Sequence, residues 1–256
     1  PAGYAAAMRA IALGKRVPLV ERDRSGGTGI HNGALASKTL WEIAHRVSST
    51  NELMRTRGRE PFRLSWEEIG KTVNEAIFER KYLYACHMQM LSNNKEGTML
   101  FKHERGTGKL VDRNIVRVER SNFSVDVRAD HIIIATGSRP RTAPGILADE
   151  EHIFTSDGIF AIEELPKSIV IIGAGVIGCE FATIFSTLGA TRVHLIDRAD
   201  RILPFEDADI SELVARNLER KGVVIHRSAK LDRIAVEGEQ VCYDLSYSDG
   251  RTETVH

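Results

Sequence analysis

The apolar residues of this chain alternate between short strand-like runs and longer helix-like stripes. The pattern is clearest from residue 168 to residue 197, where an apolar run at 169–172 leads into glycines, a helical stripe ends near Gly189, and a second run covers 193–196. A strand, a helix and a second strand in this order form a crossover unit of a parallel sheet. A shorter version of the same order opens the chain at 1–21. We therefore predict an α/β chain built on two such units.

The glycines of the second unit have the spacing of a dinucleotide-binding loop. They read Gly173-Ala174-Gly175-Val176-Ile177-Gly178, and Asp197 ends the second strand. In such a loop the first glycine permits a tight turn, the second lets a pyrophosphate approach the backbone, and the third lets helix and strand pack closely. The helix N-terminus offers free N–H groups, and the acid accepts from ribose hydroxyls. The strand, the glycines, the helix, the second strand and the acid all occur in the order and at the spacing of such a loop. We therefore favour this interpretation over a glycine-rich turn in an unrelated α/β domain.

The opening unit is incomplete. Gly3 takes the place of the third glycine, an alanine-rich helix can end at Gly14, and a strand at 17–20 leads to Glu21. Pro18 is awkward in a central strand because it cannot donate to a ladder. Both ends of the chain look cut, so we expect a fragment in which the first strand of this unit is missing and the last domain is truncated.

Two helical patterns follow the opening unit. One covers 37–48, and the other covers 65–91 and begins with a capping box formed by Ser65 and Glu68. The second helix carries an apolar stripe that we interpret as core packing rather than a cofactor site: Trp66, Ile69, Val73, Ile77, Leu83, Tyr84, Met90 and Leu91.

Strand patterns fill the middle and the end of the chain. Residues 99–127 alternate in short strands with a Gly-Thr-Gly-Lys turn at 106–109, and a buried strand is predicted at 131–134. The proline-containing stretch 139–167 is typical of a crossover between domains. The last part predicts a helix, a strand and a β-meander, at 207–221, 223–225 and 230–255.

Composition narrows the range of partners. Lys+Arg and Asp+Glu both total 35, so nothing points to nucleic acid or to an anionic membrane surface. No stretch approaches the roughly 18 continuous apolar residues that a membrane span needs. Cys86, Cys179 and Cys242 are far apart, which argues against a disulfide framework and against a metal site. A reducing compartment is favoured, without a choice between the cytoplasm and the mitochondrial matrix.

Taken together, the motifs resemble the flavoprotein disulfide reductase family, closest to its soluble pyridine nucleotide transhydrogenases and lipoamide dehydrogenase-like proteins. The shared order is the opening unit, the segment GGTGIHNGALASK at 26–38, ATGSRP at 135–140, and the second glycine unit. The resemblance implies two Rossmann-like domains in a three-layer architecture with β-meander insertions. It implies an FAD-binding domain at 1–150, an NAD(P)-binding domain at 151–256, and a homodimer formed through a C-terminal domain that this chain lacks.

The resemblance also implies the residues that contact FAD and the nicotinamide nucleotide. They are Gly3, Glu21, Arg22, Gly27, Thr28, Gly33, Ser37, Lys38, Gly108, Ala135, Thr136, Gly137, Ser138, Ser156, Gly173, Gly175, Val176, Ile177, Gly178, Glu180, Asp197 and Arg198. Asp197 favours a free ribose hydroxyl, whereas Arg198 and Arg201 could accommodate a 2′-phosphate.

The segment at 26–38 departs from the family pattern. The two family cysteines fall on Gly29 and Ala34, and the family proline falls on Ala36. A dithiol relay needs two thiols, so disulfide reduction by the usual route is excluded.

Other catalytic positions of the family are retained. Lys38 falls on the lysine near the reactive flavin nitrogen, and Glu180 falls on the glutamate that pairs with it. A buried cation there favours reduced flavin. The alternatives are a solvated lysine and an acid favoured by a helix dipole. His31 stands where soluble transhydrogenases carry a histidine, so a catalytic role is implied, and a structural histidine is the alternative.

These observations predict an FAD-dependent oxidoreductase with nicotinamide nucleotides as substrates. A hydride would pass from NAD(P)H through the flavin to a second nicotinamide nucleotide, without a redox disulfide. Two alternatives stay open: a diaphorase-like enzyme that reduces a quinone or another acceptor, and a catalytically silent paralogue that binds nucleotide.

Overall fold

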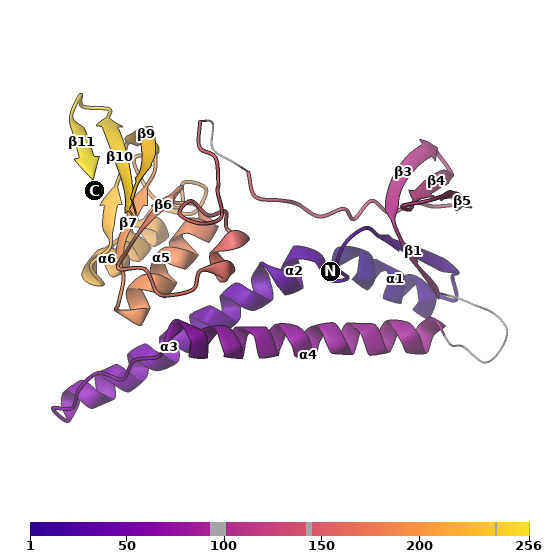
Figure 1. Ribbon diagram of the computed structural model, residues 1–256, viewed down its shortest axis with the longest axis horizontal. Helices are drawn as coiled ribbons and strands as arrows, with labels where there is room; N and C mark the ends of the chain where they lie inside the picture. Colours follow the sequence, from indigo (N-terminus) through magenta and orange to yellow (C-terminus); the bar gives the residue numbers. More distant parts are fainter. Residues whose placement is uncertain (93–100, 142–144, 239, 256) are drawn as a thin grey trace. The chain divides into compact units, whose positions relative to one another are not determined.

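The computed structural model describes residues 1–92, 101–141, 145–238 and 240–255 (Figure 1). Small parts of three predicted segments lie outside these residues: the start of the strand pattern at 99–127, part of the crossover at 139–167, and one position of the meander at 230–255. The chain divides into two compact units, one formed by 1–36 with 74–139 and the other by 37–73 with 140–256. The predicted boundary at 150/151 stays a prediction.

The first unit begins with the predicted helix and strand. Helix α1 (Ala2–Ala12) is followed by Gly14, whose φ of 71° is left-handed, and by strand β1 (Val17–Glu21). Strand β1 pairs in parallel with β2 (Phe101–Arg105). Pro18 lies in β1 opposite Lys102 of β2. Side chains of α1, α4, β1 and β2 pack around Ala7, Met88 and Phe101.

An antiparallel sheet of β3 (Thr107–Asp112), β4 (Ile115–Glu119) and β5 (Ser124–Arg128) completes this unit. The turn predicted at 106–109 is wrong, since Thr107, Gly108 and Lys109 lie in β3 opposite Glu119, Val118 and Arg117. Only Gly106 bends the chain between β2 and β3. A Cβ on Gly106 would lie 2.6 Å from the carbonyl oxygen of Glu119, so a glycine is required there.

The strand predicted at 131–134 is not formed. Ile133 and Ile134 are 68% and 70% exposed, and no described strand pairs with this segment. An apolar run becomes a strand only when a neighbour satisfies its backbone N–H and C=O groups. The same segment therefore carries the Ala135–Ser138 motif on an irregular, exposed backbone, with Gly137 at a φ of 72°.

Three helices carry the segments around residues 26–92. Helix α2 (Gly27–His31) is short, and α3 (Ala34–Thr56) extends beyond the predicted 37–48. Helix α4 (Trp66–Ser92) begins with the predicted capping box, in which the Glu68 carboxylate accepts from the Ser65 N–H at 2.8 Å.

The apolar stripe predicted on α4 is buried only in its first part. Trp66, Ile69 and Val73 are buried, whereas Leu83 and Met90 are 49% and 74% exposed. Met88 is buried instead, because it faces the core that α1, β1 and β2 form. The prediction was wrong for Leu83 and Met90, since they lie on a different face of the helix from Met88 and Leu91, which pack against this core.

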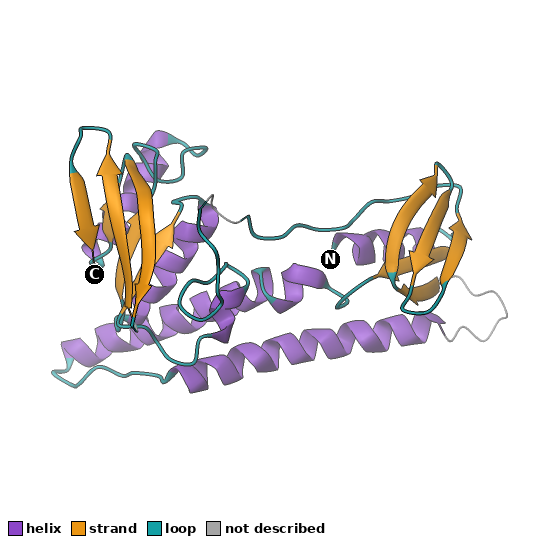
Figure 2. Ribbon diagram, turned by 45° about the horizontal axis from the view of Figure 1, so that its top comes forward, coloured by secondary structure: helices purple, strands orange, loops and turns teal. Residues whose placement is uncertain are grey.

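The second unit has three layers (Figures 1 and 2). Strands β6 (Ser168–Ile172), β7 (Arg192–Ile196) and β8 (Val224–His226) form a parallel sheet in that order. Helices α5 (Val176–Leu188) and α6 (Ala208–Arg220) contact this sheet on one face. On the other face Val170 and Ile196 pack against the meander of β9 (Ala229–Glu237), β10 (Gln240–Tyr247) and β11 (Thr252–Val255).

Short connections complete this unit. A 3-10 turn, η1 (Gly158–Ala161), lies before β6. Gly189 and Gly222 follow α5 and α6 with left-handed φ angles of 74° and 86°, as predicted for the ends of these helices. Among the described residues no helix is both long and apolar enough to cross a membrane.

Candidate functional site

The glycine loop of the second unit lies between β6 and α5. Gly173 has a φ of 100°, which favours glycine, and its N–H donates to the carbonyl of Ile196 at 2.8 Å. A Cβ on Gly178 would lie 1.9 Å from the carbonyl oxygen of Gly173, so no other residue fits without a backbone shift. A Cβ on Gly175 would meet nothing within 4 Å. The space beside Gly175 is therefore open to a ligand, as a dinucleotide-binding loop requires.

The predicted ribose acceptor, Asp197, is also a structural group. One carboxylate oxygen accepts from the N–H of Ala174 at 2.5 Å, and the other accepts from the N–H of Ala199 at 2.8 Å. The backbone of Asp197 bonds to His226 and Ala229. Each carboxylate oxygen has a second lone pair, so a ribose hydroxyl can still donate to it.

The N-terminus of α5 is open to an anion. No acidic residue lies in its first turn and no side chain caps it. Val176 and Ile177 in this turn are 66% and 57% exposed. The free N–H groups and the positive end of the helix dipole can bind a pyrophosphate. The residues present therefore fit a dinucleotide.

Lys38 and Glu180 form the predicted ion pair within the second unit. The Lys38 Nζ lies 2.6 Å from Oε1 of Glu180. Glu180 is on α5, one turn after the glycine loop, and Lys38 is in the first turns of α3. The side chain of Lys38 is 65% exposed and that of Glu180 is 17% exposed. Within this unit the Lys38 side chain is thus largely exposed, and its burial beside a flavin stays a prediction.

The first unit brings part of its predicted site together. A Cβ on Gly3 would lie 3.3 Å from Cβ of Ala135, so α1 approaches the 135–138 segment closely. Glu21 ends β1, and one of its carboxylate oxygens accepts from the N–H of Asp23 at 3.0 Å. Glu21 therefore corresponds in position to Asp197 of the second unit.

The segment at 26–38 is tightly turned. Gly26 has a φ of 98°, and a Cβ on Gly33 would lie 2.7 Å from the carbonyl oxygen of Thr28. His31 is 9% exposed, and its Nε2 lies 3.2 Å from the carbonyl oxygen of Ser25. Burial lowers the pKa of His31, and the bond to Ser25 opposes this effect. The imidazole is therefore neutral at pH 7 and donates from Nε2.

Further structural features of the site had no signal in the sequence. Leu203 has a positive φ of 47°, and its N–H donates to the carbonyl of Ala174 at 2.7 Å, which ties the loop after β7 to the glycine loop. The guanidinium group of Arg201 donates to the carbonyl of Pro204 at 2.8 Å. This group is therefore engaged within its own loop, which weakens the expectation that it accommodates a 2′-phosphate.

Cys179 does not supply a missing redox thiol. It is buried beside the glycine loop, and its thiol donates to the carbonyl of Ala174 at 3.4 Å. Burial, with a smaller contribution from Asp197, raises the pKa of Cys179 to about 11. The reactive form of a cysteine is the thiolate, so this thiol is inert at neutral pH.

The other predicted contacts are spread over both units. Arg22, Thr28 and Gly27 lie in the first unit with Gly108, whereas Ser37, Ser156 and Arg198 lie in the second. Ser37 is buried, Ser156 is half-buried, and Arg22, Thr28 and Arg198 are exposed. Their roles toward a cofactor stay predictions. The described residues contain no group of three His, Cys, Asp or Glu arranged to hold a metal ion.

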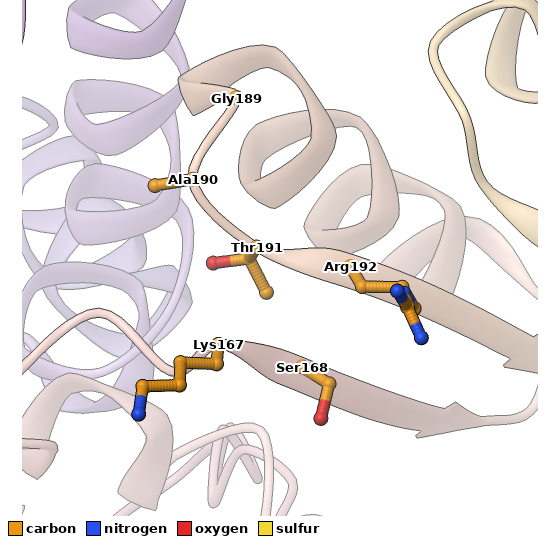
Figure 3. A pocket seen from close by; sticks show the side chains of 6 residues that line it. All are labelled: Lys167, Ser168, Gly189, Ala190, Thr191 and Arg192. Atoms are coloured by element: carbon orange, nitrogen blue, oxygen red, sulfur yellow. The ribbon is translucent and has the colours of Figure 1, made fainter.

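An open cavity of about 470 Å³ lies at the opposite end of the parallel sheet (Figure 3). It is lined by Lys167, Ser168, Gly189, Ala190, Thr191 and Arg192, at the amino ends of β6 and β7. Ligands of open parallel sheets bind at the carboxyl ends of the strands, where the glycine loop and Asp197 lie. This cavity is therefore distinct from the dinucleotide site.

Comparison with known proteins places these features in a family. Residues 1–255 match the family described as pyridine nucleotide-disulphide oxidoreductase. Dihydrolipoyl dehydrogenase from Bacillus subtilis is 34% identical over 96% of this chain and 54% of its own length. Soluble pyridine nucleotide transhydrogenase from Pseudomonas fluorescens is 33% identical over 91% of this chain and 49% of its own length.

A solved structure shows the same fold. LpdA from Mycobacterium tuberculosis superposes with a TM-score of 0.84 at 25% identity, covering 99% of this chain and 55% of that one. The chain thus spans about half the length of the relatives that it matches.

Proposed function

Since the chain belongs to the pyridine nucleotide-disulphide oxidoreductase family, whose cofactors are FAD and NAD(P), we propose that the whole protein is a transhydrogenase-like flavoprotein. It takes a hydride from NAD(P)H and delivers it to a second nicotinamide nucleotide without a redox disulfide. The observation that carries the proposal is that the Lys38–Glu180 pair is present while Gly29 and Ala34 replace both cysteines. A protein that only binds nucleotide has no need of this pair.

The chain's own residues bind and orient the nicotinamide nucleotide. The N-terminus of α5 holds the pyrophosphate, and Gly175 leaves the backbone open for it. Asp197 accepts from a ribose hydroxyl while its bonds to Ala174 and Ala199 hold the carboxylate in place. Rigid placement of the nucleotide is the main contribution that a protein makes to hydride transfer between cofactors.

Lys38 and Glu180 contribute electrostatically. FAD, when bound, supplies two-electron chemistry that can accept a hydride from one nicotinamide and give it to another. The ammonium group of Lys38 stabilises negative charge that develops nearby, and Glu180 holds this group at 2.6 Å. No described thiol replaces the cysteines, since Cys179 is protonated at neutral pH and Cys86 and Cys242 lie outside the 26–38 segment.

The test uses the complete protein purified with its flavin under anaerobic conditions. The protein is reduced with NADPH, thio-NAD is added, and flavin absorbance and thio-NADH formation are followed together. Fast, stoichiometric formation of thio-NADH supports the proposal.

Other outcomes of the same experiment point elsewhere. If the flavin is reduced but no thio-NADH forms, the transhydrogenase proposal is wrong. The protein is then a diaphorase that reduces a quinone or another acceptor. If no flavin binds, or if bound flavin is not reduced, the protein is a silent nucleotide-binding paralogue. A homodimer remains a prediction from the family resemblance, which gel filtration of the complete protein would check.

A further inference from the structure

Four polar side chains form a continuous hydrogen-bonded chain between two layers of the second unit. Nδ1 of His194 lies 3.1 Å from Nε2 of His226, and Nδ1 of His226 lies 2.6 Å from the hydroxyl of Tyr247. The Tyr247 hydroxyl donates to the carboxylate of Glu253 at 2.8 Å. His194 and His226 belong to β7 and β8 of the parallel sheet, whereas Tyr247 and Glu253 belong to β10 and β11 of the meander.

These contacts determine where the protons lie. The single proton of Tyr247 goes to Glu253, so the Tyr247 oxygen must accept from Nδ1 of His226. A neutral imidazole has one N–H, so Nε2 of His226 is an acceptor and Nδ1 of His194 is the donor to it. All protons then point from the sheet toward Glu253, and Nε2 of His194 keeps a lone pair at the start of the chain.

The two imidazoles lie in a mostly apolar layer. His226 is 6% exposed, beside the cluster of Ile196, Ala229, Tyr243 and Leu245. Burial lowers the pKa of His194 and of His226. The ionisable groups that face them are Arg192 on β7, Glu253 on β11, Tyr243 and Tyr247 on β10, and Arg251, whose guanidinium lies 4.6 Å from the centre of the Tyr247 ring.

We propose that His194, His226, Tyr247 and Glu253 form a proton relay that serves as a pH-sensitive latch between the parallel sheet and the β-meander. A first proton binds at Nε2 of His194, and the bond from Nδ1 of His194 to His226 is kept. A second proton must bind Nε2 of His226, which places two N–H groups face to face and breaks this bond. The hydrogen bond between the two imidazoles is thus kept when the pair has taken up no extra proton or one, and it is broken when the pair has taken up two. No electrons move, and the protons come from solvent.

The direction of the pH effect follows from the lowered pKa of both imidazoles. The unfolded state binds protons at the ordinary histidine pKa, and the folded state binds them only at a lower pH. The stability that the latch contributes is therefore fully present above the ordinary histidine pKa. It is lost as the pH falls through the pKa values of the two imidazoles in the folded state. The proposal does not depend on flavin or on hydride transfer.

The first experiment is ¹⁵N NMR of the histidine side chains in the full chain at pH 8. We expect both His194 and His226 to carry their proton on Nδ1. Tyr247→Phe keeps the ring but removes the hydroxyl, and His226 should lose its preference for Nδ1–H in this variant. A proton on Nε2 of His226 in the unaltered protein overturns the relay.

The second experiment measures amide hydrogen exchange of β9–β11 at pH 8 and pH 5, corrected for intrinsic exchange. We expect less protection at pH 5 than at pH 8, because protonation of both imidazoles breaks the bond between them. His194→Asn offers an amide N–H to neutral His226 and, with the amide turned, an amide oxygen to protonated His226, so most of this loss should disappear. His103→Asn, at an exposed histidine of β2, is the matched control and should behave as wild type. An undiminished loss in His194→Asn, or no loss in wild type, overturns the latch.

Discussion

The carboxylate of Asp197 and the backbone N–H of Ala174 form a hydrogen bond of 2.5 Å that ties the end of β7 to the glycine loop. The other carboxylate oxygen accepts from Ala199 at 2.8 Å. Asp197 thus holds the glycine loop in its conformation without a bound nucleotide. The residue that the sequence predicts as a ribose acceptor therefore has a folding role and a binding role at once.

Replacing Asp197 should separate these two roles. Asp197→Ala leaves the N–H of fully buried Ala174 without an acceptor, and we expect the free energy of unfolding to fall by about 1–3 kcal/mol. Affinity for NADH should fall as well. Urea unfolding and NADH titration measure the two effects. Asp200→Ala, at an exposed acid in the same loop, is the control, and equal losses in both variants would contradict the prediction.

Two glycines of the loop should respond differently to alanine. Gly178→Ala forces a Cβ to within 1.9 Å of the Gly173 carbonyl oxygen, so we expect a loss of about 1–3 kcal/mol in the free energy of unfolding from overpacking. Gly175→Ala meets nothing in the protein and should leave stability within about 0.5 kcal/mol of wild type. Its Cβ occupies the space of the pyrophosphate, so NADH affinity should still fall. Thermal unfolding and NADH titration distinguish the two variants, and the idea fails if Gly175→Ala binds normally.

The Lys38–Glu180 pair should matter more for flavin reduction than for stability. With the Lys38 side chain 65% exposed, solvent screens the pair, so Lys38→Gln should change the free energy of unfolding by only about 0–1 kcal/mol. Reduction of the flavin by NADPH should slow by about tenfold or more, which corresponds to about 1.4 kcal/mol in the barrier. Stopped-flow absorbance of the complete protein measures this rate. Lys15→Gln, at an exposed lysine before β1, is the control, and equal rates in all three proteins would refute a role for the pair.

His31 should destabilise the protein as the pH falls. Its folded pKa is below the ordinary histidine value, so the unfolded state takes up the proton first, and stability is lost between the ordinary and the folded pKa. His31→Gln retains an N–H donor near the Ser25 carbonyl and does not titrate. The difference in free energy of unfolding between pH 8 and pH 5 should therefore be smaller in His31→Gln than in wild type. The His194–His226 pair contributes equally to both proteins, so an identical difference would show that His31 is not the source.

Cys179 should be unreactive and dispensable for hydride transfer. At pH 8 its pKa of about 11 leaves about one thiolate in a thousand, and the side chain is buried. Iodoacetamide should therefore not modify Cys179 in the native protein within the time that it modifies the half-buried Cys86. Cys179→Ala should retain flavin reduction by NADPH. Rapid labelling of Cys179, detected by mass spectrometry, would contradict its placement.

Local rules account for much of what the sequence predicted correctly. Strands β6 and β7, helix α5 and its end at Gly189 follow from apolar spacing and glycine chemistry within thirty residues, and the Ser65–Glu68 capping box acts within one turn. Predictions that depended on distant partners were less accurate. The strand at 131–134 has no described neighbour, and Leu83 and Met90 of the stripe on α4 face away from the core that Met88 contacts.

The sequence by itself determined the crossover units, the glycine loop and the absence of cysteine from residues 26–38. These depend on residue identity and on short spacing. Only the tertiary structure decided that Lys38 meets Glu180 across 142 positions, that Asp197 bonds to Ala174, and that His194 reaches Glu253 through two other side chains. The physical reason is that hydrogen bonds and ion pairs act over about 3 Å, so chain packing alone determines which distant side chains come that close.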